Sequence, residues 1–338
     1  MGIIEAEERL PLTWVITDGK AGMESQCLAV ACRLGLTPLI KRVKLRAPWR
    51  LFSPWALRLG NRWALSPDGD QLREPLPDLL IASGRHSVAA SRAVAALTGQ
   101  RCLRLQIQNP GISARYFDLV AAPRHDRLIG ANVVVTRGAP HAISTAALAA
   151  ARERFASRLA ALPRPRIAVL LGGDNGAYRF GEDTAQALAN CLSTLVRGSG
   201  GSLLLTPSRR TGASTLAIFR HSLADVAGEI WDGVGDNPYL GYLAFADHIL
   251  VTADSINMVC EAAAAGVPVQ VVPLEGGSAK FRRFHADLQC DGITRPFGGR
   301  LEHWQAPRFD DSGLVAERVA ALLRRRGWVL PAGGISTG

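Results

Sequence analysis

The sequence lacks the signatures of several large protein classes. No apolar run reaches the ~18–20 residues that a membrane-spanning helix needs. The sequence also has no G-x-S-x-G, H-E-x-x-H, G-x-G-x-x-G or P-loop pattern, so hydrolase, metalloprotease and dehydrogenase activities have no motif in their favour. The segment Met1–Arg9 does not show the basic and then apolar order of a signal peptide. We therefore expect a cytoplasmic protein.

Cysteine pairs at metal-ligand or redox spacing are absent as well. The cysteines are scattered, with no C-x-x-C pair and no histidine at ligand spacing: Cys27, Cys32, Cys102, Cys191, Cys260 and Cys290. Most of them lie within helical or strand patterns, so we expect buried free thiols. The sequence predicts no metal site.

Charge is unevenly balanced, with 39 Lys and Arg against 29 Asp and Glu and a formal net charge of +10. Such a surplus suits phosphorylated substrates, anionic lipid or nucleic acid. Zinc-finger, RNP and KH patterns are missing, which argues against a nucleic-acid partner. With 48% hydrophobic and 20% charged residues, the 338-residue chain is globular and long enough for two domains.

Strand and helix patterns alternate along the whole chain, which is typical of an α/β fold with mostly parallel sheets. Apolar runs predict strands at 12–17, 79–82, 103–107, 119–122, 133–135, 167–171, 202–206 and 248–251. Helical patterns follow at about 24–34, 88–98, 145–162, 182–196 and 213–223.

The prolines at 163 and 165 break the helical pattern, and the alternation then begins again. We therefore expect two Rossmann-like domains, 1–162 and 163–338, facing each other across a cleft. Doubly wound domains bind ligands at the carboxyl ends of their strands. All the polar loops described next lie at such ends.

The stretch Thr252–Val269 is the most informative part of the second half. It predicts a strand end, a polar turn and a helix whose first turn Ser255 can cap, which is a common place for a phosphate. Glu261 comes nearly two turns later and stays near the same helical face. Its carboxylate could accept the hydroxyls of a ribose. The alternative is an ordinary βαβ unit with Glu261 solvated.

Three further groups follow strand ends of the same half. Gly172 and Gly173 let the backbone approach a ligand, because glycine has no Cβ. The loop Ser208-Arg209-Arg210-Thr211 offers two guanidinium groups and two hydroxyls to a diphosphate. Asp254 precedes Ser255. Each group also has a structural alternative, a tight turn or a solvated loop, but together they predict a phosphate and sugar site.

The first half offers candidate bases. Asp18 lies in the loop Asp18-Gly19-Lys20-Ala21-Gly22 after the first predicted strand, and His86 follows the second. Either side chain could take a proton from an acceptor hydroxyl. For Asp18, the alternative is that it only caps a helix.

Residues 44–65 combine three tryptophans with five positive charges and no acidic residue. This composition suits an anionic membrane surface, where aromatic rings lie at headgroup depth. The alternative is that short helical pieces pack their aromatic side chains under the first domain.

The order of these loops resembles the mitochondrial-fission "elongated mitochondria" family, over about residues 12–325. The matching segments are Asp18–Gln26, Ser83–Arg85, Phe117–Val120 with His125-Asp126, Gly172-Gly173, Ser208–Thr211, Thr252–Ser255 and Leu274–His285. The resemblance joins the chain to a plant protein at the mitochondrial surface, which is associated with recruiting a dynamin-like GTPase, and to many bacterial proteins.

The second half also resembles the GT-B glycosyltransferases that add N-acetylglucosamine to a lipid-linked precursor. That resemblance implies that Glu261 holds the ribose and Ser208–Thr211 the diphosphate of a nucleotide-sugar donor, without a bound metal or cofactor. The first half departs from it, because Asp18 and Lys20 stand where those enzymes have a glycine-rich loop with a histidine.

Two hypotheses of function follow. The first is a GT-B-like glycosyltransferase that uses a nucleotide-diphosphate sugar on a lipid-linked or membrane-near acceptor, peripheral at the inner face of the membrane. The second is a non-catalytic membrane-associated scaffold that keeps this fold and recruits protein partners.

Overall fold

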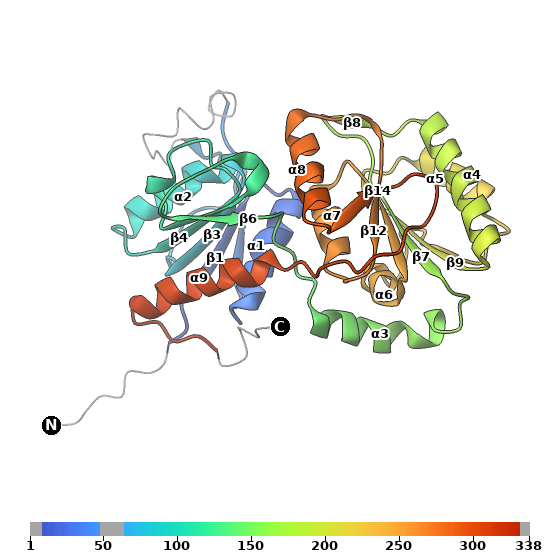
Figure 1. Cartoon of the computed structure of the whole chain (residues 1–338). Coiled ribbons are helices and arrows are strands. Elements are labelled where there is room, and N and C mark those ends of the chain that lie inside the picture. Colours follow the sequence, from blue (N-terminus) through green and yellow to red (C-terminus); the bar gives the residue numbers. More distant parts are fainter. Residues whose placement is uncertain (1–8, 48–63, 332–338) are drawn as a thin grey trace. The chain divides into compact units, whose positions relative to one another are not determined.

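The computed structural model describes residues 9–47 and 64–331 of the chain. It divides them into two compact units (Figure 1). Unit 1 runs to Ala142 and resumes at Asp310, and unit 2 is Ile143–Phe309. Most of the basic, tryptophan-rich segment 44–65 lies outside the described residues. Its two ends are tied together by a bridge between Leu45 and Leu65.

Unit 1 is built on a six-stranded parallel sheet in the order β2-β1-β3-β4-β5-β6. The strands are β1 (Thr13–Thr17), β2 (Leu39–Arg42), β3 (Leu79–Ser83), β4 (Leu103–Ile107), β5 (Leu119–Pro123) and β6 (Val133–Thr136). The helices are α1 (Ala21–Arg33), α2 (Val88–Leu97) and α9 (Asp311–Arg325), with the 3₁₀ turns η3 (Arg85–Ser87), η4 (Ala114–Tyr116) and η5 (Arg124–Asp126). Every residue of β1, β3 and β5 is buried, as expected for strands covered on both faces.

Unit 2 repeats the architecture, with a parallel sheet in the order β10-β9-β7-β11-β12-β14. Its strands are β7 (Arg166–Leu171), β9 (Ser202–Pro207), β10 (Gly228–Ile230), β11 (His248–Thr252), β12 (Val269–Val272) and β14 (Thr294–Pro296), and β8 (Tyr178–Arg179) pairs antiparallel with β13 (Glu275–Gly276). Its helices are α3 (Thr145–Leu159), α4 (Glu182–Ser199), α5 (Ala213–Ser222), α6 (Tyr239–Phe245), α7 (Ile256–Ala263) and α8 (Ala279–Cys290).

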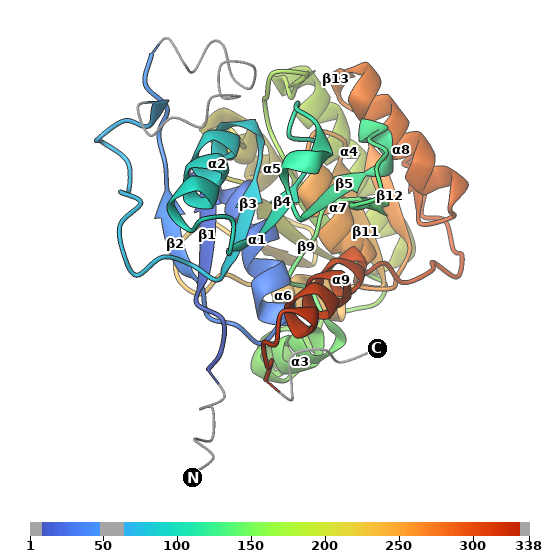
Figure 2. The same cartoon turned by 90° about the vertical axis from the view of Figure 1, so that its left-hand side faces the viewer.

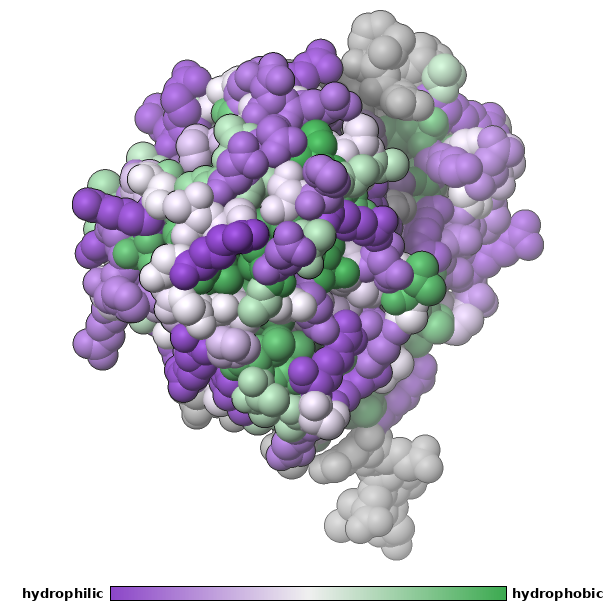
Figure 3. Space-filling model, turned by 90° about the vertical axis from the view of Figure 1, so that its right-hand side faces the viewer, coloured by the Kyte–Doolittle hydropathy of each residue, from purple (hydrophilic) through white to green (hydrophobic). Residues whose placement is uncertain are grey.

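Each sheet is covered by apolar helix faces. In unit 1, α1 and α9 lie side by side (Figure 2), and they bury residues such as Val30 and Val319 with Ile81. In unit 2, α4 and α5 pack on one face through residues such as Leu192 and Phe219. The side of unit 2 seen in Figure 3 is mainly hydrophilic, with smaller apolar areas between charged side chains. The α/β class with two Rossmann-like units is thus confirmed.

The unit boundaries differ from the expected boundary at residue 162. Helix α3 belongs to unit 2, because Phe155 packs directly over Gly241 of α6, where a Cβ would lie 2.6 Å from the ring. Arg152 also donates to the carbonyl of Ala244.

The C-terminal helix, in turn, returns to unit 1. The carboxylate of Asp311 at the start of α9 accepts hydrogen bonds from the backbone N–H groups of Arg137 and Gly138. The Ser312 hydroxyl donates to the carbonyl of His141 at 2.8 Å. Contacts so distant in sequence leave no local pattern that could place α9 in unit 1.

Cysteine burial differs in part from the expectation. Cys27, Cys102 and Cys260 are buried free thiols, but Cys32 and Cys290 are exposed, because they lie on the outward faces of α1 and α8. No helix within the described ranges is both long enough and apolar enough to cross a bilayer.

Candidate functional site

Three loops of unit 2 meet at the carboxyl edge of its sheet. They follow β7, β9 and β11, which are neighbours in the order β9-β7-β11. The loops carry Gly172 and Gly173, Ser208–Thr211, and Asp254 with Ser255. The structure therefore brings together the second-half groups that the sequence predicted at equivalent strand ends. Their roles toward a ligand stay predictions.

Asp254 is the centre of this cluster, and its side chain is fully buried. Its Oδ2 accepts from Nη2 of Arg210 at 2.6 Å and from the backbone N–H of Gly173 at 3.1 Å. Its Oδ1 accepts from the Thr252 hydroxyl at 2.6 Å. The carboxylate thus cross-links all three loops. The structure gives Asp254 this framework role, and the ligand contact expected from the sequence stays a prediction.

The two glycines are required by the same cluster. A Cβ on Gly172 would lie 2.0 Å from Oδ1 of Asp254, and a Cβ on Gly173 would lie 2.0 Å from the carbonyl oxygen of Arg210. The space that glycine leaves is therefore filled by the protein's own atoms. The close approach predicted for a ligand is, in this structure, the close approach of one loop to another.

The loop after β9 folds on itself as a hydroxyl-stabilised turn. The backbone N–H of Ser208 donates to Oγ1 of Thr211 at 2.9 Å, and the N–H of Arg210 donates to Oγ of Ser208 at 3.2 Å. Arg210 also donates to the carbonyl of Gly173 at 3.2 Å. Arg209, by contrast, is exposed and has no hydrogen-bond or ion-pair partner among the described residues. Of the two predicted diphosphate ligands, only Arg209 is entirely uncommitted.

Helix α7 begins directly after this cluster. Ser255 is its N-cap, with an extended backbone and with its hydroxyl accepting from the N–H of Met258 at 3.4 Å. The capping role predicted from sequence is confirmed. The start of the helix carries the positive end of its dipole, which favours an anion.

Glu261 lies further along α7 and is half-buried. Its Oε2 accepts a hydrogen bond from the hydroxyl of Tyr239 at 2.6 Å. Burial raises the pKa of Glu261, and the Tyr239 hydrogen bond only partly offsets that rise. Oε1 has no hydrogen-bond partner within the described part of the chain. One carboxylate oxygen is therefore left for a ligand hydroxyl.

Sequence reasoning assigned no role to two aromatic neighbours of Asp254. Burial raises the pKa of Tyr178, and the charge of Asp254 adds to the rise. His285 on α8 is buried, with Nε2 lying 2.9 Å from the carbonyl oxygen of Ala253 and Nδ1 buried without a hydrogen-bond partner. Burial lowers the pKa of His285 despite the nearby Asp254. The sequence feature that could have drawn attention to His285 is its place at the end of Leu274–His285, one of the segments that carry the family resemblance.

Unit 1 holds a separate polar cluster at its own carboxyl edge. Oδ2 of Asp18, in the loop after β1, lies 2.5 Å from Nζ of Lys20 and 3.2 Å from Nδ1 of His86 in η3. The structure thus joins the two predicted base candidates, which are 68 residues apart in the chain. Lys20 is the additional member of the cluster.

The electrostatics distinguish the two candidates. Burial acts to raise the pKa of Asp18, but the hydrogen bonds and charge of Lys20 together with His86 outweigh it and hold the pKa below its ordinary value. A carboxylate with a lowered pKa is a weak base. Asp18 is therefore better suited to orient His86 through Nδ1, which leaves Nε2 of the imidazole to accept a proton.

The described parts of the two units group no metal ligands. Within residues 9–47 and 64–331, no three His, Cys, Asp or Glu side chains are placed so that they could hold an ion. The cluster of unit 2 is built from arginine, hydroxyl and carboxylate groups, and that of unit 1 from a carboxylate, an ammonium group and an imidazole.

Several solved structures have the same fold. The chain matches S. aureus MnaA bound to UDP with a TM-score of 0.54 and 12% identity, covering 95% of this chain and 98% of that one. A UDP-GlcNAc 2-epimerase from Methanocaldococcus jannaschii gives 0.54 and 13%, covering 93% and 99%. MurG from Acinetobacter baumannii gives 0.50 and 18%, covering 94% and 92%. These likenesses confirm the GT-B-like fold.

Comparison of sequences identifies the family, whereas the solved structures show the fold alone. An uncharacterized protein of Rickettsia prowazekii is 25% identical, over 92% of this chain and 98% of its own length. The mitochondrial fission protein ELM1 of Arabidopsis thaliana is 32% identical over 281 residues, 75% of this chain, and the match spans 66% of the plant protein. The family described as mitochondrial fission ELM1 matches residues 21–323. The chain belongs to the mitochondrial fission ELM1 family.

Proposed function

We propose that unit 2 binds a nucleoside-diphosphate sugar at the carboxyl edge of its sheet and that the protein is a glycosyltransferase. The observation that carries the proposal is the placement of Glu261 on α7, with Oε1 uncommitted and a Ser255-capped helix start ahead of it. The helix start suits the diphosphate, and the free carboxylate oxygen suits a ribose hydroxyl. Arg209 supplies an uncommitted positive charge in the loop after β9, one residue before the Arg210 that pairs with Asp254 ahead of this helix start.

The roles follow from the chemistry of transfer. An acceptor hydroxyl attacks the anomeric carbon of the sugar, and the bond from that carbon to the diphosphate oxygen breaks. Arg209 and the dipole of α7 stabilise the charge that develops on the leaving diphosphate. Nε2 of His86 takes the proton of the acceptor hydroxyl, with Asp18 orienting the imidazole.

Calorimetric titration with UDP, GDP and ADP tests the donor site. We expect one nucleotide to bind and Glu261→Gln to weaken it about tenfold or more, because a hydrogen bond to a charged group contributes about 1.5–3 kcal/mol. Arg209→Gln should have a similar effect. The exposed Glu153 and Arg220 of the same unit provide matched controls, Glu153→Gln and Arg220→Gln, that should bind like the wild type. No binding of any of the three nucleotides would refute the donor site.

A turnover assay tests the base. With UDP-N-acetylglucosamine as the probe, His86→Gln should leave nucleotide affinity unchanged while release of UDP falls by at least a hundredfold. Equal loss of affinity and turnover would contradict the assigned role, because it would indicate a general disturbance of the fold.

The second candidate is the membrane-associated scaffold. A specific observation favours it: the groups at this edge are already used within the protein. Asp254 pairs with Arg210 and fills the space beside Gly172, and the Thr211 hydroxyl donates to the carbonyl of Leu171. A scaffold that retains the fold needs this framework and no ligand. It predicts binding to anionic vesicles at low salt that is unaffected by Glu261→Gln, measured by co-sedimentation. Absence of vesicle binding would count against it.

A further inference from the structure

A pocket of about 510 Å³ lies at the amino edge of the sheet of unit 1. Asp78, which directly precedes β3, and Cys102, which directly precedes β4, both line it. Asp18 and His86 follow β1 and β3 at the opposite edge of the same sheet. The pocket is therefore separate from Asp18 and His86, the unit 1 residues of the proposed transferase.

Arg101 provides an uncommitted positive charge in this pocket. Its Nε donates to the carbonyl of Thr98 at 3.0 Å, which fixes the guanidinium plane. Nη1 and Nη2 have no partner among the residues that the structure describes. Arg326 also lines the pocket, but its Nη1 donates to the carbonyl of Arg101 at 2.8 Å and its Nη2 to Asp118 at 2.6 Å. The hydrogen bonds of Arg326 thus fix one wall of the pocket, whereas Nη1 and Nη2 of Arg101 remain available to a ligand.

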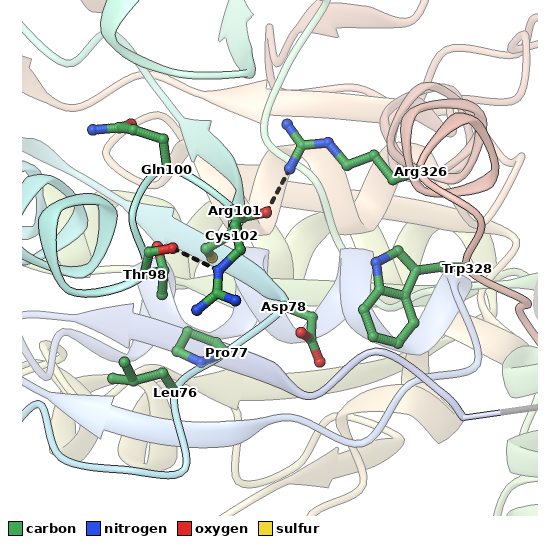
Figure 4. Close-up of a pocket in the computed structure, with 9 residues that line it drawn as sticks. All are labelled: Leu76, Pro77, Asp78, Thr98, Gln100, Arg101, Cys102, Arg326 and Trp328. Carbon is green, nitrogen blue, oxygen red and sulfur yellow. Dashed lines mark hydrogen bonds between the residues drawn. The ribbon is translucent and has the colours of Figure 1, made fainter. Parts of the chain in front are cut away.

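Asp78 provides the opposite charge. Its Oδ2 accepts from the N–H of Leu12 at 3.0 Å, and Oδ1 has no partner in the described ranges. Figure 4 shows its carboxylate between Arg101 and Trp328. Asp78 and Arg101 form no ion pair with each other, although both line the same pocket. Two opposite charges therefore stand apart, each without a charged partner.

Trp328 forms the remaining wall with a half-buried indole ring. The face of an indole attracts a cation, and the attraction grows when the cation is partly removed from water. An ammonium group near Asp78 would therefore meet both a carboxylate and an aromatic face. The anion-binding side and the cation-binding side of the pocket are thus distinct.

We propose that this pocket binds a compact zwitterion that carries an ammonium group close to a phosphate or carboxylate. The anionic group pairs with Nη1 and Nη2 of Arg101 through two charge-assisted hydrogen bonds. The ammonium lies between Oδ1 of Asp78 and the ring of Trp328. A purely anionic ligand would leave Asp78 unsatisfied and repelled, so the pocket selects for both charges.

Calorimetric titration of the full chain with O-phosphoethanolamine tests the proposal. We expect binding of one molecule per chain, with inorganic phosphate and ethanolamine each binding at least tenfold more weakly. Phosphate binding as tightly as phosphoethanolamine would overturn the proposal, because the site would then be a simple anion site. Failure of phosphoethanolamine to bind at millimolar concentration would overturn it as well.

Two variants separate the two charges. Arg101→Gln should weaken phosphoethanolamine at least tenfold. Asp78→Asn keeps an acceptor for Leu12 but should reduce the affinity for phosphoethanolamine to that for phosphate. The exposed Arg324 of α9 does not line the pocket and gives the matched control Arg324→Gln, which should bind like the wild type. Wild-type affinity in Arg101→Gln would contradict the proposal.

A second experiment, with lipid vesicles, distinguishes a lipid headgroup from a soluble zwitterion. Co-sedimentation with phosphatidylethanolamine vesicles but not with phosphatidylcholine vesicles, lost in Arg101→Gln, would assign a lipid headgroup. Binding of free phosphoethanolamine without vesicle binding would assign a soluble zwitterion.

Discussion

The hydroxyl of Tyr239 donates a 2.6 Å hydrogen bond to Oε2 of Glu261. The two residues are 22 positions apart, and the bond ties the first residue of α6 to α7. Burial raises the pKa of both groups, and the charge of Glu261 raises that of Tyr239 further. The tyrosine therefore stays a neutral donor, and it stabilises the charged form of a carboxylate that burial disfavours.

Tyr239→Phe should make nucleotide binding more sensitive to acid. Removal of the donor raises the pKa of Glu261 further, so the carboxylate is protonated at a higher pH and loses its acceptor role toward a ribose. Titrations with the nucleotide that binds should show near wild-type affinity at pH 8 and a larger loss than in the wild type at pH 6. The additional loss should vanish in the Glu261→Gln background. Parallel pH profiles of Tyr239→Phe and wild type would contradict this coupling.

Gly172→Ala should destabilise unit 2 while Gly176→Ala does not. The new Cβ at position 172 meets Oδ1 of Asp254 at 2.0 Å, whereas at position 176 no atom lies within 4 Å. Overpacking of this kind costs typically ~1–3 kcal/mol. Urea denaturation of the two variants gives the comparison, and equal midpoints would show that the three loops at the carboxyl edge of unit 2 are less rigid than the structure indicates.

Asp254→Asn should lower the free energy of unfolding by about 2 kcal/mol. Loss of one partner of a fully buried pair costs roughly 3–5 kcal/mol, but the Arg210 side chain is 37% exposed, so water takes over part of its solvation. Asp225 is exposed on the same unit, and Asp225→Asn should be neutral within about 0.5 kcal/mol. Chemical denaturation measures both, and similar values for the two variants would refute the framework role of Asp254.

The stability of unit 2 should fall as the pH is lowered from 7 to 5. Burial holds the pKa values of His248 and His285 below the ordinary 6.5. Below pH 6.5 the unfolded chain binds protons that the folded chain does not, so stability is complete above 6.5 and is lost as the pH falls toward the folded pKa values.

Each histidine contributes a slope of at most about 1.4 kcal/mol per pH unit. Denaturation midpoints measured at pH 7, 6 and 5 should therefore decline, and His285→Gln should decline less steeply. An unchanged slope in His285→Gln would show that other groups carry the effect.

Local patterns were enough for most of the fold. The apolar runs at 167–171 and 248–251 are buried strands because a parallel sheet covers both faces of each strand. Ser255 caps α7 as its hydroxyl predicted. The assignment of α3 to unit 2 required tertiary contact, since it depends on Phe155 meeting Gly241. The helix over 311–325 likewise joins unit 1 through contacts that no local pattern reveals.

The sequence alone determined where the polar loops gather, because parallel strands bring their following loops to one edge whatever those loops contain. Only the tertiary structure decided what each side chain does there. It turned Asp254 and Arg210 toward each other, left Arg209 and Oε1 of Glu261 uncommitted, and joined Asp18 to His86. A side chain's partner depends on which groups folding brings within hydrogen-bond distance, and that proximity is not encoded in its neighbours along the chain.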